Sequence, residues 1–209
     1  MKIAKNLILI FITGLALISR SQNNNTIELG IEGGPGWAFL RSDETQYNND
    51  RGTAIGFLGG IAVQFNLTKN LAIKSGLAFE NKGHAQKVLL TDHLGNQLGN
   101  VKWRHSLSYI TVPLLFRASF GKNVPFFINA GPFAGFLIHQ TGGYYLFSRA
   151  DAGLSAGLGI TIPLNTKTDL TFELRNNLGL MNIGPSEIPS APVKTNNLLF
   201  LTGFSWKLG

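Results

Sequence analysis

The residues best suited to metal binding or acid–base chemistry in this chain of 209 residues are four histidines, His84, His93, His105 and His139. A tight turn near residue 122 would set His105 opposite His139. A loop near residue 145 would set His139 opposite Asp151. Such a row could bind a metal ion or relay protons, because a histidine needs a partner that fixes its tautomer. Hydrogen bonds that tie strands to loops at a rim would use the same residues. We favour this structural role, so we expect no metal ligand among them.

A serine hydrolase would need an exposed serine, a histidine and an orienting acid. Ser106 and Ser108 lie beside His105, but neighbouring residues on a strand point to opposite faces. No GxSxG motif is present. The glycines from Gly30 to Gly36 resemble a nucleotide loop, but strand packing explains them better because no helical pattern follows. We therefore expect no enzyme, no catalytic residue and no cofactor.

Composition excludes several other classes of protein. Charged residues make up 14% of the chain, against about 25% in ordinary soluble domains. Apolar residues make up 44%, with 15 Phe and 25 Gly, whereas disordered chains are rich in charge and poor in aromatic residues. The absence of Cys excludes a disulfide framework and a Cys-based metal site.

Residues 1–21 are predicted to form a secretory signal peptide that is cleaved before Gln22. Its features are a basic start, an apolar stretch and small residues at the cleavage site: Lys2, Lys5, Leu7–Ile18, Ser19 and Ser21. The apolar stretch is too short for a membrane-spanning helix, which takes about 20 residues. Without this leader the net charge falls from +7 to +4, which is a weak argument for nucleic acid, so no nucleic-acid partner is expected.

The rest of the chain, 22–209, is predicted to be one domain of β-strands, because apolar residues alternate with small or polar ones. In 151–163, for example, the apolar residues all fall on one face. The pattern predicts eight strands, at 27–39, 54–67, 71–82, 106–120, 126–139, 151–163, 169–180 and 197–208. Strands of this length can cross hydrocarbon when tilted, and an even number returns the chain to its starting side.

The predicted connections alternate in length. Tight turns fall at 66–70, 121–124 and 164–168, and longer polar connections at 41–52, 82–105, 140–150 and 182–196. This is the plan of outer-membrane barrels. The fold class predicted is all-β: an eight-stranded antiparallel up-and-down transmembrane barrel with short periplasmic turns and longer extracellular loops.

The apolar face is predicted to meet lipid, because the opposite face is too small and too rich in Gly for a solvated surface. A small barrel has little interior room, and buried charges need partners. The inward charged residues expected are Glu28, Glu32, Lys74, Glu80, Arg117, Glu173, Arg175 and Lys207. Aromatic residues expected at the two membrane interfaces are Trp37, Phe39, Phe79, Trp103 and Tyr109 at one end, and Phe65, Phe120, Phe126 and Trp206 at the other. The alternative is a soluble periplasmic calyx that binds a ligand inside.

Four segments of the chain resemble the PorT-type outer-membrane β-barrel family of Gram-negative bacteria. They are 109–117 (YITVPLLFR), 127–133 (FINAGPF), 153–159 (GLSAGLG) and 173–179 (ELRNNLG). The resemblance extends over about 27–208. It implies an eight-stranded barrel in the outer membrane and a structural, interaction or secretion-associated role. An outer-membrane lipid-modifying enzyme is the least supported alternative.

The connection 82–105 is expected to be a basic outer loop. It contains Lys82, Lys87, Lys102, Arg104 and three histidines, against the single acid Asp92. Such a loop could contact lipopolysaccharide phosphates or an acidic partner. The partners expected are therefore outer-membrane lipid, lipopolysaccharide and a secretion-system or cell-envelope protein, with the barrel itself monomeric.

Overall fold

The computed structural model describes residues 26–42, 51–92, 94, 97–141, 147–184 and 192–208. The predicted signal peptide and His93 lie outside these residues. The eight strands are β1 (Ile27–Ser42), β2 (Arg51–Asn66), β3 (Leu71–Thr91), β4 (Gln97–Phe120), β5 (Phe126–Thr141), β6 (Ala150–Pro163), β7 (Thr168–Gly179) and β8 (Val193–Leu208). The eight predicted strands are confirmed, and several are longer than predicted.

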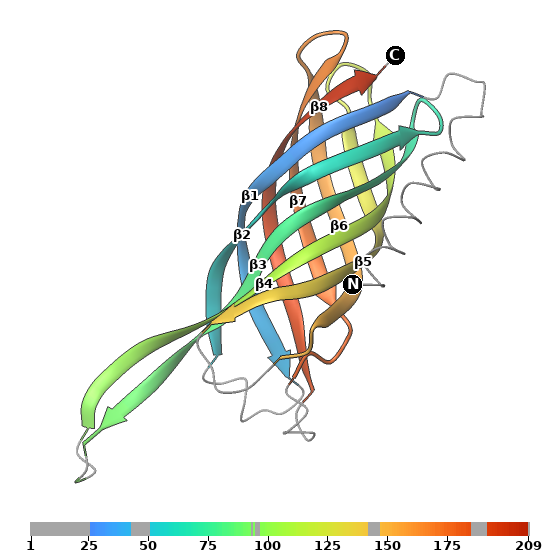
Figure 1. Cartoon of the computed structure of the whole chain (residues 1–209). Coiled ribbons are helices and arrows are strands. Elements are labelled where there is room, and N and C mark those ends of the chain that lie inside the picture. The colour runs from blue at the N-terminus through green and yellow to red at the C-terminus, as the bar shows by residue number, and fades with distance from the viewer. Residues whose placement is uncertain are drawn as a thin grey trace.

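Each strand pairs antiparallel with the next, and β8 pairs with β1 to close a barrel (Figure 1). The closing register sets Ile27 opposite Leu208 and Trp37 opposite Leu198. Closure leaves no open sheet edge in the wall, which a bilayer requires because it offers no hydrogen bonds to the backbone. Among the described residues, no helix is long and apolar enough to cross a membrane.

The three tight turns lie at one end of the barrel, which we call the turn end. They join β2 to β3 at 67–70, β4 to β5 at 121–125 and β6 to β7 at 164–167, as predicted. Thr68 and Asn165 accept backbone hydrogen bonds within their turns. Gly121 has a φ of 96°, a conformation that glycine adopts without a Cβ penalty. The opposite end is called the loop end.

The connection predicted as a loop at 82–105 is instead mostly strand. β3 and β4 keep one register from Leu71 opposite Ala118 to Leu90 opposite Gly99. Beyond Gln86 in β3 and before Ser106 in β4, neither strand pairs with β2 or β5 among the described residues. The two strands therefore leave the wall as a hairpin at the loop end (Figure 1). We call residues 87–91 and 97–105 the β3–β4 ribbon.

The apolar face points outward, as predicted. Leu154 and Leu158 are each 52% exposed, whereas Glu173 and Arg175 are 3% and 1% exposed. A soluble calyx has the reverse arrangement, so the calyx alternative is wrong. The side chain of Trp103 lies outside the described part of the chain. Among the aromatic side chains that are described, one departs from the prediction. Tyr109 was expected at the membrane interface, but its position on β4 faces the lumen and it is fully buried.

Candidate functional site

The lumen is filled by charged side chains from β1, β3, β4 and β7, which we call the central ion cluster: Glu32, Lys74, Arg117, Glu173 and Arg175. Arg175 donates to both oxygens of Glu173 at 2.6 and 2.9 Å, and to both oxygens of Glu32 at 2.9 and 3.1 Å. Lys74 donates to Glu32 at 2.5 Å and lies 3.7 Å from Glu173. Arg117 lies 3.9 Å from Glu173. Arg175 thus links β7 to β1 past the intervening β8, and Lys74 on β3 faces Glu173 on β7 across the lumen.

This arrangement can offset the cost of burying charge. Each carboxylate accepts charge-assisted hydrogen bonds, and the forked geometry of Arg175 lets it serve both acids at once. Arg117 also stacks over the Phe127 ring, 3.8 Å from its centroid. Gly159 faces this ring, and a Cβ there would lie 2.5 Å from Phe127 Cζ. The glycine therefore leaves room for an aromatic side chain inside the barrel.

A second set of buried charges lies nearer the loop end and is built around Lys82. Its ammonium group donates to Asp151 at 3.0 Å, lies 3.5 Å from Glu80 and sits 4.6 Å from the centre of the Phe133 ring. Lys82 was expected in an outer loop, but it is 1% exposed. It continues the lumen-facing series of β3 after Lys74 and Glu80. We call Glu80, Lys82 and Asp151 the upper ion cluster.

Neutral side chains complete the hydrogen bonding of the upper ion cluster. Glu80 accepts from three of them, Thr111 at 2.9 Å, Asn177 at 3.0 Å and Asn197 at 2.8 Å. Asp151 accepts from Thr195 at 2.8 Å. Because the donors come from β4, β7 and β8, this cluster also spans the lumen.

An apolar cluster lies in the lumen at the loop end. Its members are fully or nearly fully buried: Leu40, Leu107, Tyr109, Ile183 and Val193, with Leu137 and Phe147 packed against them. Ile183 belongs to the connection after β7. Its carbonyl accepts from Ser148 N at 3.0 Å, and its N–H donates to Val193 at 2.7 Å. Ile183 is therefore held in the mouth of the barrel.

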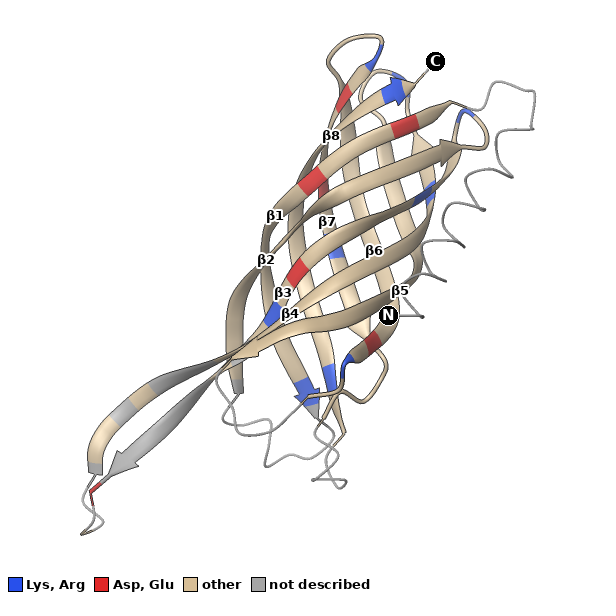
Figure 2. Cartoon of the chain, in the orientation of Figure 1, with Lys and Arg blue, Asp and Glu red and all other residues tan. Residues whose placement is uncertain are grey.

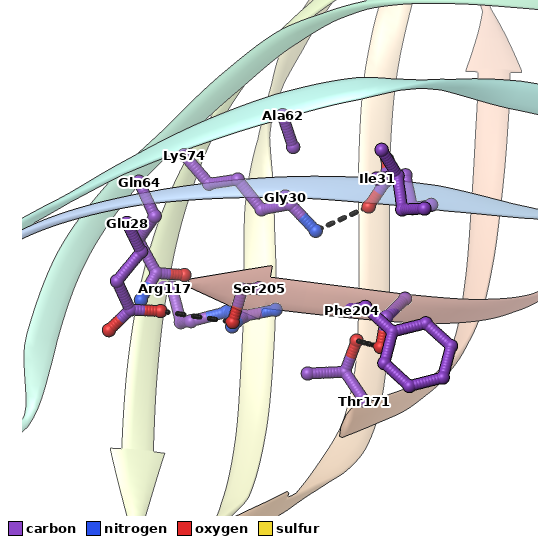
Figure 3. Close-up of a pocket in the computed structure, with 12 residues that line it drawn as sticks. Glu28, Gly30, Ile31, Ala62, Gln64, Lys74, Arg117, Thr171, Phe204 and Ser205 are labelled. Atoms are coloured by element: carbon purple, nitrogen blue, oxygen red, sulfur yellow. Dashed lines mark hydrogen bonds and ion pairs between the residues drawn. The ribbon is translucent and has the colours of Figure 1, made fainter. Parts of the chain in front are cut away.

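A small cavity lies on the other side of the central ion cluster, toward the turn end (Figure 3). Glu28, Lys74, Arg117 and Ser205 reach it from four different strands, with Ser205 donating to Glu28 at 3.3 Å. Its volume is about 30 Å³. Ligand pockets are usually about 300–1,000 Å³. This cavity could hold about two water molecules, which need roughly 10–15 Å³ each on such a measure.

The predicted row of His105, His139 and Asp151 is not formed. His139 pairs with Ser108 across the β4–β5 ladder, where a β-bulge shifts the register, and Asp151 pairs with Gly135. His139 is exposed, whereas Asp151 is in the upper ion cluster. His105 pairs with His84. The part of the chain that the structure describes contains no group of three potential metal-binding side chains.

The two serines considered for a hydrolase site are hydrogen-bonded to Asn81. Ser106 and Ser108 both accept from Asn81 Nδ2, at 2.7 and 3.1 Å. The glycines 30–36 lie within β1, as expected from the strand reading. The absence of enzymatic activity stays a prediction.

Large apolar side chains inside the barrel were not anticipated. The lumen holds Leu58, Leu115, Phe127, Phe133, Leu199 and Leu201, all nearly fully buried. The sequence does carry a signal for them, because each occupies a position that alternates with the outward apolar residues of its strand. The expected inward charges are buried, except that Lys207 is partly exposed and pairs with Asp169 at 2.9 Å.

A closed eight-stranded barrel with an apolar outside and a paired ionic inside defines an integral membrane β-barrel. Residues 20–184 match the family described as Outer membrane protein beta-barrel domain, and the chain belongs to that family. It is a small protein of the Gram-negative outer membrane. No curated protein is detectably similar to it in sequence.

Solved structures share the fold at low sequence identity. The outer membrane protein OprG from Pseudomonas aeruginosa is 14% identical, with a TM-score of 0.53 over 90% of this chain and 98% of that chain. Neisserial surface protein A (NspA) is 14% identical, with a TM-score of 0.50 over 86% of this chain and 97% of that chain. A major outer membrane protein from Thermus thermophilus is 12% identical, with a TM-score of 0.50 over 89% of this chain and 100% of that chain. At these identities the likeness shows the fold.

Proposed function

We propose that this protein is a non-conducting outer-membrane barrel that holds the β3–β4 ribbon outside the cell, where the ribbon binds a partner. The observation that carries this proposal is the hairpin itself. β3 and β4 continue to pair with each other after both have left the wall of the barrel. Barrels of the outer membrane have their short turns in the periplasm and their longer loops outside the cell. The turn end therefore faces the periplasm, and the loop end with the ribbon faces the outside.

The filled lumen supports an interaction role over a channel. Two ion clusters cross the interior, and the apolar cluster with Ile183 lies in the lumen at the loop end. Planar-bilayer recording tests this point. We expect no conductance in the nanosiemens range, and a stable conductance of that size would contradict the proposal.

The partner that we propose is a protein of a secretion system or of the cell envelope, in a PorT-like role. The support is the resemblance of residues 109–117 and 173–179 to that family, together with the exposed ribbon. Leu94 and Leu98 are 74% and 68% exposed at its tip. Exposed apolar side chains on a projecting hairpin are suited to contact another protein.

Crosslinking in cells tests the proposed partner. A photoreactive residue at Leu98 should capture a specific envelope protein. The matched control is the same residue at Val124, which is 53% exposed in a turn at the opposite end. A product formed from both sites, or from neither, would contradict the proposal.

We also propose that lipopolysaccharide surrounds the loop end of a monomeric barrel. Lys87 and Lys102 occupy paired positions in the ribbon, and Arg104 lies two residues further along β4. Basic residues just beyond a lipid-facing surface can bind phosphates. The leader 1–21 is proposed to be removed on export. Sequencing of the mature N-terminus should find Gln22 first.

A further inference from the structure

At the turn end, one lysine lies in each of the three tight turns, and a fourth lies where β8 meets β1. Lys69, Lys122 and Lys167 lie in the three tight turns, and Lys207 lies near the end of β8, beside β1. Lys207 pairs with Asp169. The three turn lysines are exposed, and none forms an ion pair within the described part of the chain. Figure 2 shows basic but no acidic segments in these turns.

Each of these turns, and the place where β8 meets β1, also exposes an aliphatic side chain. Leu67, Val124, Leu164 and Leu208 are between 49% and 53% exposed. The strands beside the turns expose further apolar residues, namely Leu71, Phe120, Phe126 and Trp206. The lipid-facing surface therefore continues into the turns themselves, and each turn lysine lies within three residues of its aliphatic neighbour.

Hydrogen bonds tie the turns that carry Lys69 and Lys167 to neighbouring strands. Lys167 N donates to Asn165 at 2.9 Å, and Lys207 N donates to the Lys167 carbonyl at 2.8 Å. Asn70, next to Lys69, donates from its side chain to the Ser119 carbonyl at 2.8 Å. The backbone of two of the turns is thus tied to an adjacent strand.

We propose that Lys69, Lys122 and Lys167 bind the phosphate groups of anionic phospholipids in the leaflet that surrounds the turn end. A lysine can bury its aliphatic stem against apolar surface while its ammonium group reaches a headgroup. An acidic protein docked on this end would neutralise the lysines but leave Leu67, Val124 and Leu164 uncovered. A lipid leaflet covers both kinds of side chain. This proposal does not depend on the ribbon or its partner.

Boundary-lipid selectivity tests the proposal directly. The full chain is reconstituted in phosphatidylcholine vesicles, and the protein-bound fractions of spin-labelled phosphatidylglycerol and phosphatidylcholine are compared. The test variant is Lys69→Gln/Lys122→Gln/Lys167→Gln. The charge-retaining variant is Lys69→Arg/Lys122→Arg/Lys167→Arg. The loop-end control is Arg149→Gln/Lys194→Gln. Because it removes two charges and the test variant removes three, the change in lipid selectivity is compared per charge removed.

The wild type should prefer phosphatidylglycerol by about fivefold at each turn lysine, the scale of one basic residue at an anionic surface. The glutamine variant should lose this preference, while the arginine variant and the loop-end control keep it. Heat-modifiable migration on gels confirms that each variant is folded. Equal selectivity in the wild type and the glutamine variant would overturn the proposal. So would lysine-dependent capture of soluble polyglutamate by a barrel that shows no lipid preference.

Discussion

Replacing Arg175 with Met removes the base that joins the two carboxylates of the central ion cluster. Four hydrogen bonds to Glu32 and Glu173, between 2.6 and 3.1 Å, are lost. Glu32 retains Lys74, but Glu173 retains only two bases, at 3.7 and 3.9 Å. Glu173 is therefore left buried without a close partner. Breaking a buried pair in this way costs about 3–5 kcal/mol.

The free energy of unfolding can be measured for Arg175→Met by urea titration in lipid vesicles, with Trp fluorescence as the probe. We expect a loss of about 3–5 kcal/mol against the wild type. Arg175→Lys should lose less, because it keeps the charge but not the forked geometry. Adding Glu173→Gln to Arg175→Met should recover about 0.5–3 kcal/mol relative to additivity, because the uncompensated charge is removed.

Lys207→Gln is the matched control, because it breaks an ion pair whose lysine side chain is 32% exposed. Partly exposed pairs contribute about 0–1 kcal/mol. If Arg175→Met unfolds at the same urea concentration as Lys207→Gln, with the same slope, the network does not stabilise the barrel. That result would refute the reasoning.

Three further predictions follow from the lumen and the rim. Lys82→Met leaves two buried carboxylates without their base, so unfolding should become easier by about 3–5 kcal/mol; an unchanged urea midpoint would contradict this. Gly159→Val should cost about 1–3 kcal/mol because the new side chain meets the Phe172 carbonyl and the Phe127 ring. Gly59→Val should be nearly neutral, since a Cβ there meets nothing within 4 Å. Equal costs in the urea titration would show that the lumen is not tightly packed at Gly159. Zn²⁺ should neither bind tightly nor change the melting temperature, because His139 is exposed and apart from Asp151; a sub-micromolar site in calorimetry that is lost in His139→Ala would show the opposite.

The strands were predictable because the two sides of the wall meet different surroundings. Leu154 and Leu158 meet lipid while Ser155 and Gly157 face the lumen. Apolar residues therefore alternate with small or polar ones along the strand, and this period of two can be recognised in the sequence. The tight turns were predictable for the same reason, since the pattern stops at 164–167. The ribbon was missed because its strands leave the wall and its mixed composition resembles a polar loop.

The histidine row could not be predicted, because pairing across a hairpin depends on single residues in the turn and on bulges. The β4–β5 turn, which sets Phe120 opposite Phe126, already displaces His139 by two residues from His105, and the bulge between Ser108 and Tyr109 displaces it by one more. The hydrogen-bond partners of Asp151 could not be predicted from the sequence either. Lys82 and Thr195 reach it from β3 and β8, across a lumen whose width and tilt no local pattern specifies.

The central claim is that the apolar face of the barrel wall meets lipid and the opposite face lines the lumen. Spin labels at single Cys residues test it. The chain has no Cys, so each label is unique. Labels at Leu158 and Ile160 should be relaxed by oxygen dissolved in the lipid. A label at Thr171, which lines the small cavity inside the filled lumen, should be reached by neither dissolved oxygen nor a water-soluble nickel complex. Nickel access at Leu158 and Ile160, with oxygen access at Thr171, would contradict the account.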